Sequence, residues 1–209
     1  MAVHPTATIE AGVTIGRGTA IWDNVHIRCS THIGDECIIG EKTYIAYGVH
    51  IGHRVKINAF VYICTGVTIE RGVMIAAGTV FTNDRFPRAA TPDFRHLLPS
   101  DPDEHTLPTI VREGATIGAQ STIGCDLTIG RFAMVGMGSV VTRAVPDFVI
   151  VAGNPARAVG YACACGQRLL TGVHGLVHGP LEAECASCGA HYEVDGESVS
   201  ERQPVHQRG

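Results

Sequence analysis

An apolar side chain recurs at every sixth position through the first part of the chain. The run begins at Val3 and ends at Phe81. The twelve positions between them are all isoleucine: Ile9, Ile15, Ile21, Ile27, Ile33, Ile39, Ile45, Ile51, Ile57, Ile63, Ile69 and Ile75. A period of six fits neither the 3.6-residue turn of an α-helix nor the alternation of a long strand.

A second column lies four residues after the first, and its members are small or β-branched: Ala7, Val13, Thr19, Val25, Thr31, Cys37, Thr43, Val49, Val55, Val61, Val67, Val73 and Thr79. Glycine often follows the isoleucine directly, as at Gly16, Gly34, Gly40 and Gly52. We expect these glycines to allow turn conformations that other residues resist. The pattern therefore predicts a short buried strand and a turn, repeated with every hexapeptide.

The repeat is interrupted once. It resumes at Val111, Ile117, Ile123, Ile129, Val135 and Val141. Residues 85–108, between the two runs, contain five of the ten prolines. Proline cannot donate a backbone hydrogen bond, so this segment is predicted to leave the repeat as a loop. It is either a tolerated insertion or a functional loop, and we favour function because long loops in compact proteins usually have one.

The cysteines fall into two groups. Cys29, Cys37, Cys64 and Cys125 are scattered through the repeats, whereas Cys163, Cys165, Cys185 and Cys188 crowd into a tail where the period has stopped. Clustered cysteines in a reducing compartment more often hold a metal than form disulfides. The two pairs, each followed by glycine, predict a small zinc ribbon over residues 161–196 with a closed, structural site.

Two histidines between the cysteine pairs, His174 and His178, are alternative ligands for one of the cysteines. Residues 197–209 are polar, and we expect them to be disordered.

Composition excludes several classes of protein. A net charge of -4 and an isoelectric point near 6.2 argue against a basic nucleic-acid-binding surface. The sequence contains no apolar run of about 18 residues that would span a membrane, and its first residues lack the pattern of a secretory signal. We expect a cytoplasmic protein with one main domain, residues 1–160, and a small tail.

The repeat resembles that of the left-handed parallel β-helix family, in which three hexapeptides form one triangular coil. The resemblance extends from residue 3 to about 157. It implies an all-β fold of stacked coils, from which the predicted loop protrudes and after which the ribbon predicted from the cysteines follows. The left hand is implied by the resemblance alone.

Two segments resemble the bacterial N-acetyltransferases that acylate a 3-amino sugar linked to UDP or dTDP. They are FTNDRFPR, residues 81–88, and VTRAVPDFVIVAGNPARAVGY near the end of the repeats. The resemblance implies that acetyl-CoA is the cosubstrate, that Asn83 orients the sugar amine and that Arg88 closes the loop on the sugar. The family usually has paired asparagines where this chain has Asn58 and Ala59. The identities of the sugar and of the nucleotide therefore stay open.

The chemistry of an amine acceptor fits an asparagine at the loop entry. A hydroxyl needs a general base to attack a thioester, whereas a neutral amine mainly needs orientation. The Asn83 oxygen can accept one N–H of the amine, and Asp84 can attract the ammonium form or take its proton. Alternatively, Asn83 and Asp84 only begin a turn, as these residue types commonly do.

Polar and aromatic residues recur at intervals of three hexapeptides, so they should stack about 4.8 Å apart on successive coils. His32 and His50 form one such pair; His26, Tyr44 and Tyr62 form another column. We expect both to point outward. Four roles are open for these stacked side chains. They line a trimer interface, where the family forms its active sites, or they contact the nucleotide base. Alternatively they bind a metal, as in the carbonic anhydrases of this fold, or form a solvated face. We take His32, His50 and Tyr62 as candidate substrate-binding residues.

The resemblance also places the pantetheine arm of CoA along residues 114–141, where Gly136 is one of several glycines that keep the surface open. Arg143 and Arg157 are candidates for the CoA phosphates, or else ordinary surface charges.

The sequence thus favours a homotrimeric, acetyl-CoA-dependent N-acetyltransferase of a nucleotide-linked amino sugar. The alternatives are an acyltransferase for another amine or a hydroxyl, a metalloenzyme like carbonic anhydrase, and a non-catalytic scaffold whose ribbon recruits a partner.

Overall fold

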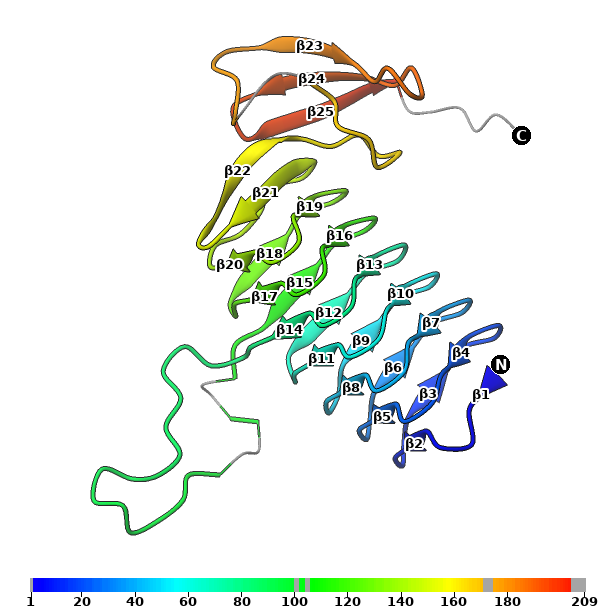
Figure 1. The fold of residues 1–209 in the computed structure, drawn as a ribbon, viewed down its shortest axis with the longest axis vertical. Coiled ribbons are helices and arrows are strands. Elements are labelled where there is room, and N and C mark those ends of the chain that lie inside the picture. The colour runs from blue at the N-terminus through cyan, green and yellow to red at the C-terminus, as the bar shows by residue number, and fades with distance from the viewer. Residues whose placement is uncertain (1, 100–101, 104–105, 171–174, 204–209) are drawn as a thin grey trace.

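The computed structural model describes residues 2–99, 102–103, 106–170 and 175–203. Within these residues every regular element is a β-strand, and no helix is long or apolar enough to cross a lipid bilayer. The strands stack as the coils of a parallel solenoid, with one loop projecting from its side and a small sheet above its C-terminal end (Figure 1). The predicted all-β solenoid is confirmed.

Three parallel sheets form the walls of the solenoid. The first sheet contains β1 (Ala2–Val3), β4 (Ala20–Ile21), β7 (Ile38–Ile39), β10 (Lys56–Ile57), β13 (Met74–Ile75), β16 (Thr116–Ile117), β19 (Met134–Val135) and β21 (Val149–Gly153), and ends with the antiparallel β22 (Ala156–Tyr161). The second contains β2 (Thr8–Ile9), β5 (His26–Ile27), β8 (Tyr44–Ile45), β11 (Tyr62–Ile63), β14 (Val80–Phe81), β17 (Thr122–Ile123) and β20 (Val140–Val141). The third contains β3 (Thr14–Ile15), β6 (His32–Ile33), β9 (His50–Ile51), β12 (Val67–Ile69), β15 (Thr109–Val111) and β18 (Leu127–Ile129).

Neighbouring strands in each sheet come from successive coils, three hexapeptides apart in the sequence. His32 pairs with His50, and Tyr44 pairs with Tyr62. Each coil donates backbone hydrogen bonds to the next, as where Tyr44 N donates to Val61 O over 2.9 Å. Residues at equal positions in successive coils therefore lie directly above one another.

Both predicted columns fill the interior. Ile27, Ile45 and Ile63 of the second sheet have no exposed surface, and Val49 and Val61 of the other column are 0% and 1% exposed. The residue between the two columns, such as Tyr62, points outward. In the first coil, which has no coil beneath it, the side chains of the isoleucine column are partly exposed: Val3 and Ile9 are each 37% exposed.

Threonine is tolerated in this core because each of its buried hydroxyl groups donates a hydrogen bond to a backbone carbonyl oxygen. Thr19, Thr31 and Thr43 are buried, and each Oγ1 donates to the carbonyl oxygen of the residue 15 positions later, at 2.8, 2.9 and 3.1 Å. A buried hydroxyl without such a partner would be costly.

The expected reason for glycine after isoleucine is wrong. Gly16 and Gly40 are not among the residues with positive φ. A Cβ on Gly16 would lie 2.4 Å from the carbonyl carbon of Gly34, and a Cβ on Gly40 would lie 2.6 Å from that of Asn58. Glycine is needed at these positions because the next coil approaches too closely for a side chain.

The loop lengthens one coil without disturbing the stack. Across the loop Thr68 pairs with Ile110, and on the next coil Ile110 pairs with Thr128 at the ordinary interval of three hexapeptides. The chain leaves the coils after Phe81, ahead of the predicted start at residue 85, and returns to them at Thr109.

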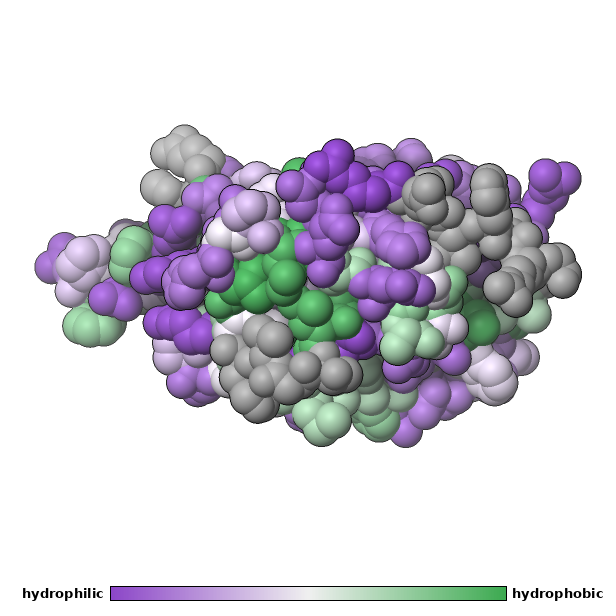
Figure 2. Space-filling view, turned by 90° about the horizontal axis from the view of Figure 1, so that it is seen from above, coloured by the Kyte–Doolittle hydropathy of each residue, from purple (hydrophilic) through white to green (hydrophobic). Residues whose placement is uncertain are grey.

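The tail forms a separate antiparallel sheet of β23 (Leu181–Glu184), β24 (His191–Asp195) and β25 (Ser198–Gln203). The prediction that residues from 197 onward are disordered is wrong for β25, where Val199 pairs with Val194 across a tight turn. Residues 204–209 lie outside the described residues. Seen from this end, hydrophobic residues (green) gather near the middle of the face, among hydrophilic ones (purple) (Figure 2).

Adjacent isoleucines of β7 test how the solenoid is stabilised. Ile39 is 0% exposed, whereas its neighbour Ile38 points outward and is 41% exposed. We expect Ile39→Ala to lower the free energy of unfolding by about 2–5 kcal/mol, because it leaves a cavity between coils. Ile38→Ala is the matched control and should cost far less. Equal losses for the two variants in urea-induced unfolding would contradict the assignment of the core.

Candidate functional site

The two outward columns flank one corner of the solenoid. The rings of His32 and His50, on the third sheet, lie 4.9 Å apart between centroids. The rings of Tyr44 and Tyr62, on the second sheet, are stacked 5.2 Å apart and nearly parallel, at 6°. His32, His50 and Tyr62 are exposed, as predicted. The histidine pair and the tyrosine pair thus occupy different faces, on either side of the corner from which the loop leaves.

The tyrosine column is braced by charged residues that the sequence analysis did not single out. Arg28 donates from Nη1 to Tyr44 Oη over 2.9 Å, and its guanidinium lies 4.0 Å from the centroid of the Tyr47 ring. Arg28 also pairs with Glu10 one coil below, at 2.6 Å. Arg28 thus connects Tyr44 and Tyr47 to the coil below.

Asn83 lies at the corner itself, half-buried at the loop base. Its backbone oxygen accepts a hydrogen bond from Leu107 N at 2.9 Å, which closes the base of the loop. Its side-chain Nδ2 donates to Thr65 O at 3.4 Å, one coil below. In the described part of the chain no hydrogen bond to Asn83 Oδ1 is found, so among those residues this acceptor has no partner.

Asp84 begins a turn. Its Oδ1 accepts a hydrogen bond from Phe86 N at 2.7 Å, the arrangement in which an aspartate side chain imitates a backbone turn. The alternative that Asp84 is a turn residue therefore has direct support. Its exposed carboxylate still has a second oxygen, so a role in proton transfer stays a prediction.

Arg88 and Asp84 line one hollow under the loop, together with Arg85, Phe86, Leu98, Pro99, Asp103 and Leu107. Arg88 is exposed and donates to the carbonyl oxygen of Pro87 at 3.2 Å. Arg85, which the sequence did not suggest, forms an ion pair with Asp126 at 2.8 Å. That pair joins the loop entry to the coil beyond the loop.

The thiol nearest the corner is not a nucleophile. Cys64 is 3% exposed, and its burial, with the nearby Cys125 thiol, raises the Cys64 pKa to about 12. Because the thiolate is the reactive form, Cys64 stays inert at neutral pH. The Cys64 thiol therefore adds no nucleophile to the amide of Asn83 and the carboxylate of Asp84.

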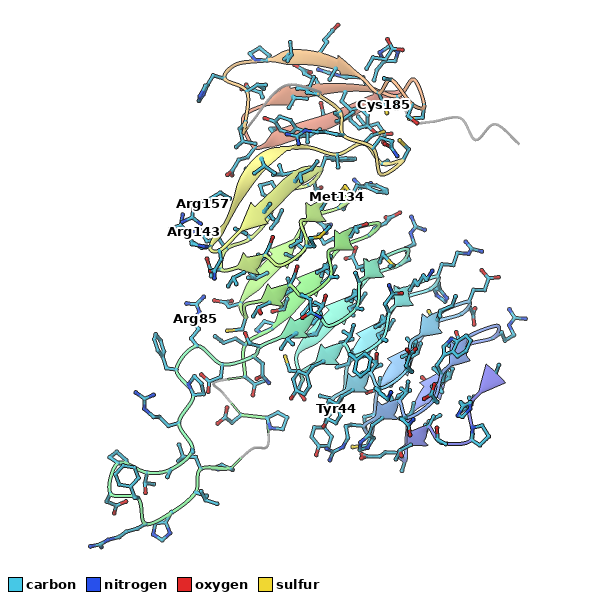
Figure 3. The ribbon with its side chains drawn as sticks, in the orientation of Figure 1. Tyr44, Arg85, Met134, Arg143, Arg157 and Cys185 are labelled. Carbon is cyan, nitrogen blue, oxygen red and sulfur yellow. The ribbon has the colours of Figure 1, made fainter. Side chains whose placement is uncertain are left out.

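A second candidate site lies at the C-terminal end of the solenoid. Arg143, two residues after the end of β20, and Arg157, on β22, project from the same edge of the molecule (Figure 3). They line one pocket of about 120 Å³, whose walls include Val145, Pro146 and Val149. This volume is well below the roughly 300–1,000 Å³ of pockets that enclose a whole small molecule. It suits one phosphate group between two guanidinium groups.

Gly136 does not line this pocket. A Cβ there would lie 2.9 Å from the Ala152 Cβ, and its carbonyl oxygen accepts hydrogen bonds from Ser121 Oγ at 3.2 Å and Ser139 Oγ at 2.6 Å. Close packing explains this glycine, and a contact with CoA stays a prediction.

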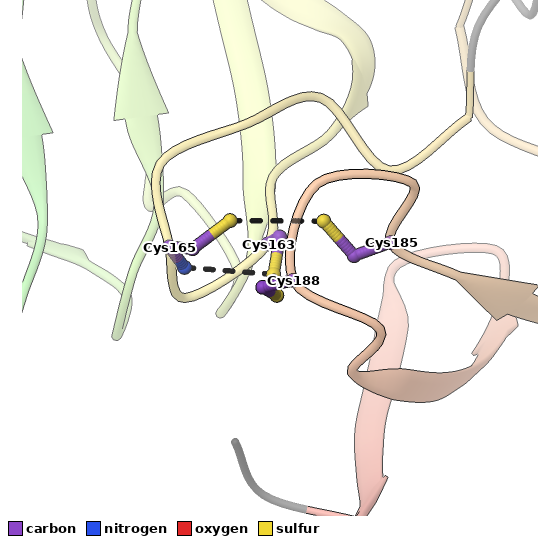
Figure 4. Close-up of side chains that lie close together, drawn as sticks. All are labelled: Cys163, Cys165, Cys185 and Cys188. Carbon is purple, nitrogen blue, oxygen red and sulfur yellow. Dashed lines mark hydrogen bonds between the residues drawn. The ribbon is translucent and has the colours of Figure 1, made fainter. Parts of the chain in front are cut away.

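The four tail cysteines come together although the two pairs lie well apart in the sequence (Figure 4). Their sulfur atoms all lie within 4.8 Å of one another, with Cys163–Cys188 at 3.5 Å and Cys165–Cys185 at 3.6 Å. A tetrahedral zinc with Zn–S bonds of about 2.3 Å requires sulfurs about 3.8 Å apart. The spacing fits that geometry.

The surroundings act differently on the thiols of the cluster: burial raises the pKa of Cys163 to about 12 and also raises the pKa of Cys165, whereas the pKa of Cys185 is lowered. Burial alone would raise the pKa of the Cys185 thiol, but hydrogen bonds from the backbone N–H groups of Cys188 and Ser187 outweigh it and lower the pKa to about 7. Among the described residues, this cluster is the one group of three or more histidine, cysteine, aspartate or glutamate side chains placed closely enough to bind a single ion. His178 lies outside the group, and His174 lies outside the described residues.

Comparison with known proteins identifies the repeat. The family described as bacterial transferase hexapeptide (six repeats) matches residues 12–47 and 48–83, and the hexapeptide repeat of succinyl-transferase matches residues 108–143. The matches stop at the loop and resume after it. The chain belongs to the hexapeptide-repeat transferase family.

Curated relatives match short stretches. One is the dTDP-3-amino-3,6-dideoxy-alpha-D-galactopyranose 3-N-acetyltransferase of Aneurinibacillus thermoaerophilus, 56% identical over 61 residues, 29% of this chain and 32% of the relative. Another is the serine acetyltransferase of Escherichia coli K12, 48% identical over 50 residues, 24% of this chain and 18% of the relative. The chain thus spans about a third or less of the length of these relatives.

Two solved structures show a similar outline. One is an N-acyltransferase variant from Bacillus cereus in complex with dTDP and coenzyme A, with a TM-score of 0.48 and 22% identity, covering 76% of this chain and 79% of that chain. The other is WeeI from Acinetobacter baumannii, with a TM-score of 0.48 and 26% identity, covering 76% of this chain and 57% of that chain.

Proposed function

We propose that the protein is an acetyl-CoA-dependent N-acetyltransferase acting on the amine of a sugar linked to UDP or dTDP. The observation that carries this proposal is Asn83, whose backbone oxygen and side-chain Nδ2 are both hydrogen-bonded at the base of the loop, while no hydrogen bond to its Oδ1 is found among the described residues. The family membership and the 56% identity to an amino-sugar N-acetyltransferase over 61 residues support it.

In the proposed reaction, Asn83 Oδ1 accepts one N–H of the neutral amine and points its lone pair at the thioester carbonyl. Nitrogen then bonds to the carbonyl carbon and the carbon–sulfur bond breaks. The CoA thiolate leaves and takes the proton that the nitrogen loses on becoming an amide. Asp84 receives the proton that the ammonium form must lose before attack. Arg88 contacts the nucleotide-linked sugar, and Arg143 and Arg157 hold a CoA phosphate.

The first test of this mechanism is Asn83→Ala. We expect turnover to fall about 10- to 1000-fold, the range for losing one positioning contact, with little change in the KM for acetyl-CoA. The measurement is the initial rate of thiol release with UDP- and dTDP-linked amino sugars. Asn24→Gly removes an exposed amide at another corner, where the φ of 53° suits glycine, and this matched control should retain activity.

Asp84→Asn separates the two roles of Asp84, since asparagine also supports the turn. A proton acceptor predicts a defect that shrinks as pH rises, because more of the amine is then already neutral. A turnover of Asn83→Ala equal to that of the unaltered protein would overturn the mechanism. Loss of all turnover in His50→Ala, with both substrates still bound, would move the base to the histidine column.

We further propose that the active unit is a homotrimer, with His32, His50 and Tyr62 at the contacts between subunits. Support comes from the large side chains that a single chain leaves exposed on the second sheet, where Tyr62 at 44% and Val80 at 39% pair on adjacent strands. Sedimentation equilibrium should give three times the chain mass of 22.1 kDa. A monomer at micromolar concentration would contradict the proposal.

We propose that Cys163, Cys165, Cys185 and Cys188 hold one structural zinc ion. Four thiolates close the coordination shell, so the ion would brace the tail and not act on substrate. Protein purified without chelator should contain one zinc per chain by elemental analysis. Cys185→Ser should lose most of it, whereas Cys29→Ser, outside the tail, should keep it. Equal zinc in both variants would rule out this site.

We also propose the organisation that the family resemblance implies. Residues 1–160 form the acyltransferase domain, its coils wind left-handed, and the zinc-binding tail begins at 161. The eight cysteines are unpaired, which supports a cytoplasmic location where thiols stay reduced. An experimental structure would reveal the hand directly.

A further inference from the structure

The tail contributes a third charged side chain to the pocket of Arg143 and Arg157. Glu197, in the turn between β24 and β25, lines that same pocket. The two arginines belong to the repeats and their last strands, whereas Glu197 belongs to the tail sheet. The pocket is therefore built jointly by the solenoid and the tail.

The position of Glu197 is fixed through its neighbour. Asp195 pairs with Ser198, so Gly196 and Glu197 form a tight turn, and Gly196 has a φ of 54°. The Gly196 carbonyl oxygen accepts a hydrogen bond from Tyr161 Oη at 2.6 Å. Tyr161 is fully buried at the end of β22, and its hydroxyl also accepts from Val177 N at 3.0 Å. The turn is thereby attached to the strand that carries Arg157.

Charge determines what this position does. Two guanidinium groups alone would attract any phosphate strongly, and a carboxylate in the same small pocket opposes part of that attraction. All three residues are exposed, so the effect is moderate and screened by salt. Glu197 lowers the net charge of the pocket from two positive charges to one.

We propose that Glu197 is a specificity-determining residue of the phosphate pocket, one that limits the affinity for CoA. The proposal rests on the proposed function, because it takes the ligand to be a phosphate group of CoA. A limited affinity serves a transferase, since free CoA must leave after each acyl transfer while its phosphates are unchanged. The tail thus acts on cosubstrate binding and not only on stability.

The test is calorimetric titration of the full-length protein with CoA and with dephospho-CoA, which lacks the 3′-phosphate. Glu197→Gln should bind CoA about 3- to 10-fold more tightly at low ionic strength, with the gain shrinking as salt is added. Glu182→Gln is the matched control: it removes the same charge from an exposed position on β23 that does not line the pocket. Equal tightening in both variants would reduce the effect to net charge and overturn the proposal.

The dephospho-CoA arm identifies the phosphate. A gain confined to CoA assigns the 3′-phosphate to the pocket, and a gain for both ligands assigns the diphosphate; either supports a role for Glu197. An unchanged affinity in Glu197→Gln contradicts it.

Arginine variants separate this proposal from the proposed function. If Arg143→Ala and Arg157→Ala weaken CoA binding while Glu197→Gln has no effect, only the role of Glu197 fails. If neither arginine variant alters CoA binding, the phosphate pocket of the proposed function fails and Glu197 with it. Combining Glu197→Gln with Arg143→Ala should abolish most of the gain, because the two charges act on the same ligand.

Discussion

The stacking of identical positions in successive coils is the constraint on which the rest of the structure depends. Backbone hydrogen bonds between coils set the spacing, and isoleucines that fit it fill the interior. Once that register holds, every outward position becomes a column. The strand register alone therefore places His32 beside His50 and Tyr44 beside Tyr62. Many of the turns contain a residue with positive φ, even at Lys42, and the regular core offsets that repeated strain.

The loop depends on the same register. Because the loop is inserted at one corner and the coil resumes in phase, the insertion perturbs neither neighbouring coil. Its base is closed by Leu107 N donating to Asn83 O and by the ion pair of Arg85 with Asp126. A rigid stack thus presents a long excursion at a defined corner. Such a corner suits the orientation of an acceptor amine, since positioning is what an amide can contribute.

What the sequence predicts well is whatever the period controls. The six-residue period predicts the strands, the buried columns and the outward columns. It also indicates where the loop interrupts the repeat. The period does not explain why residue 16 is glycine. The reason is that the Gly34 backbone, one coil later, lies too close for a side chain. Arg85 was missed because its partner Asp126 lies on the far side of the loop in the sequence. β25 did leave a signal: Asp195-Gly196 between alternating apolar residues is typical of a hairpin.

The tail lacks the period, so its contacts with the solenoid had to be seen in the structure. A solenoid must cover its terminal coil, and here β22 and the buried rings of Phe148 and Tyr192, 5.5 Å apart, join the tail to that end. Tyr192 Oη in turn lies 3.2 Å from the Cys163 sulfur, and Tyr161 precedes Cys163 closely in the chain while bonding to Gly196. The cysteine cluster and the Glu197 turn are therefore attached to the same short stretch of chain. In the proposed zinc-bound form, an ion that orders the cysteines also orders the carboxylate that shares a pocket with the two arginines. The proposed metal site and the proposed phosphate pocket are thereby connected through a chain of contacts.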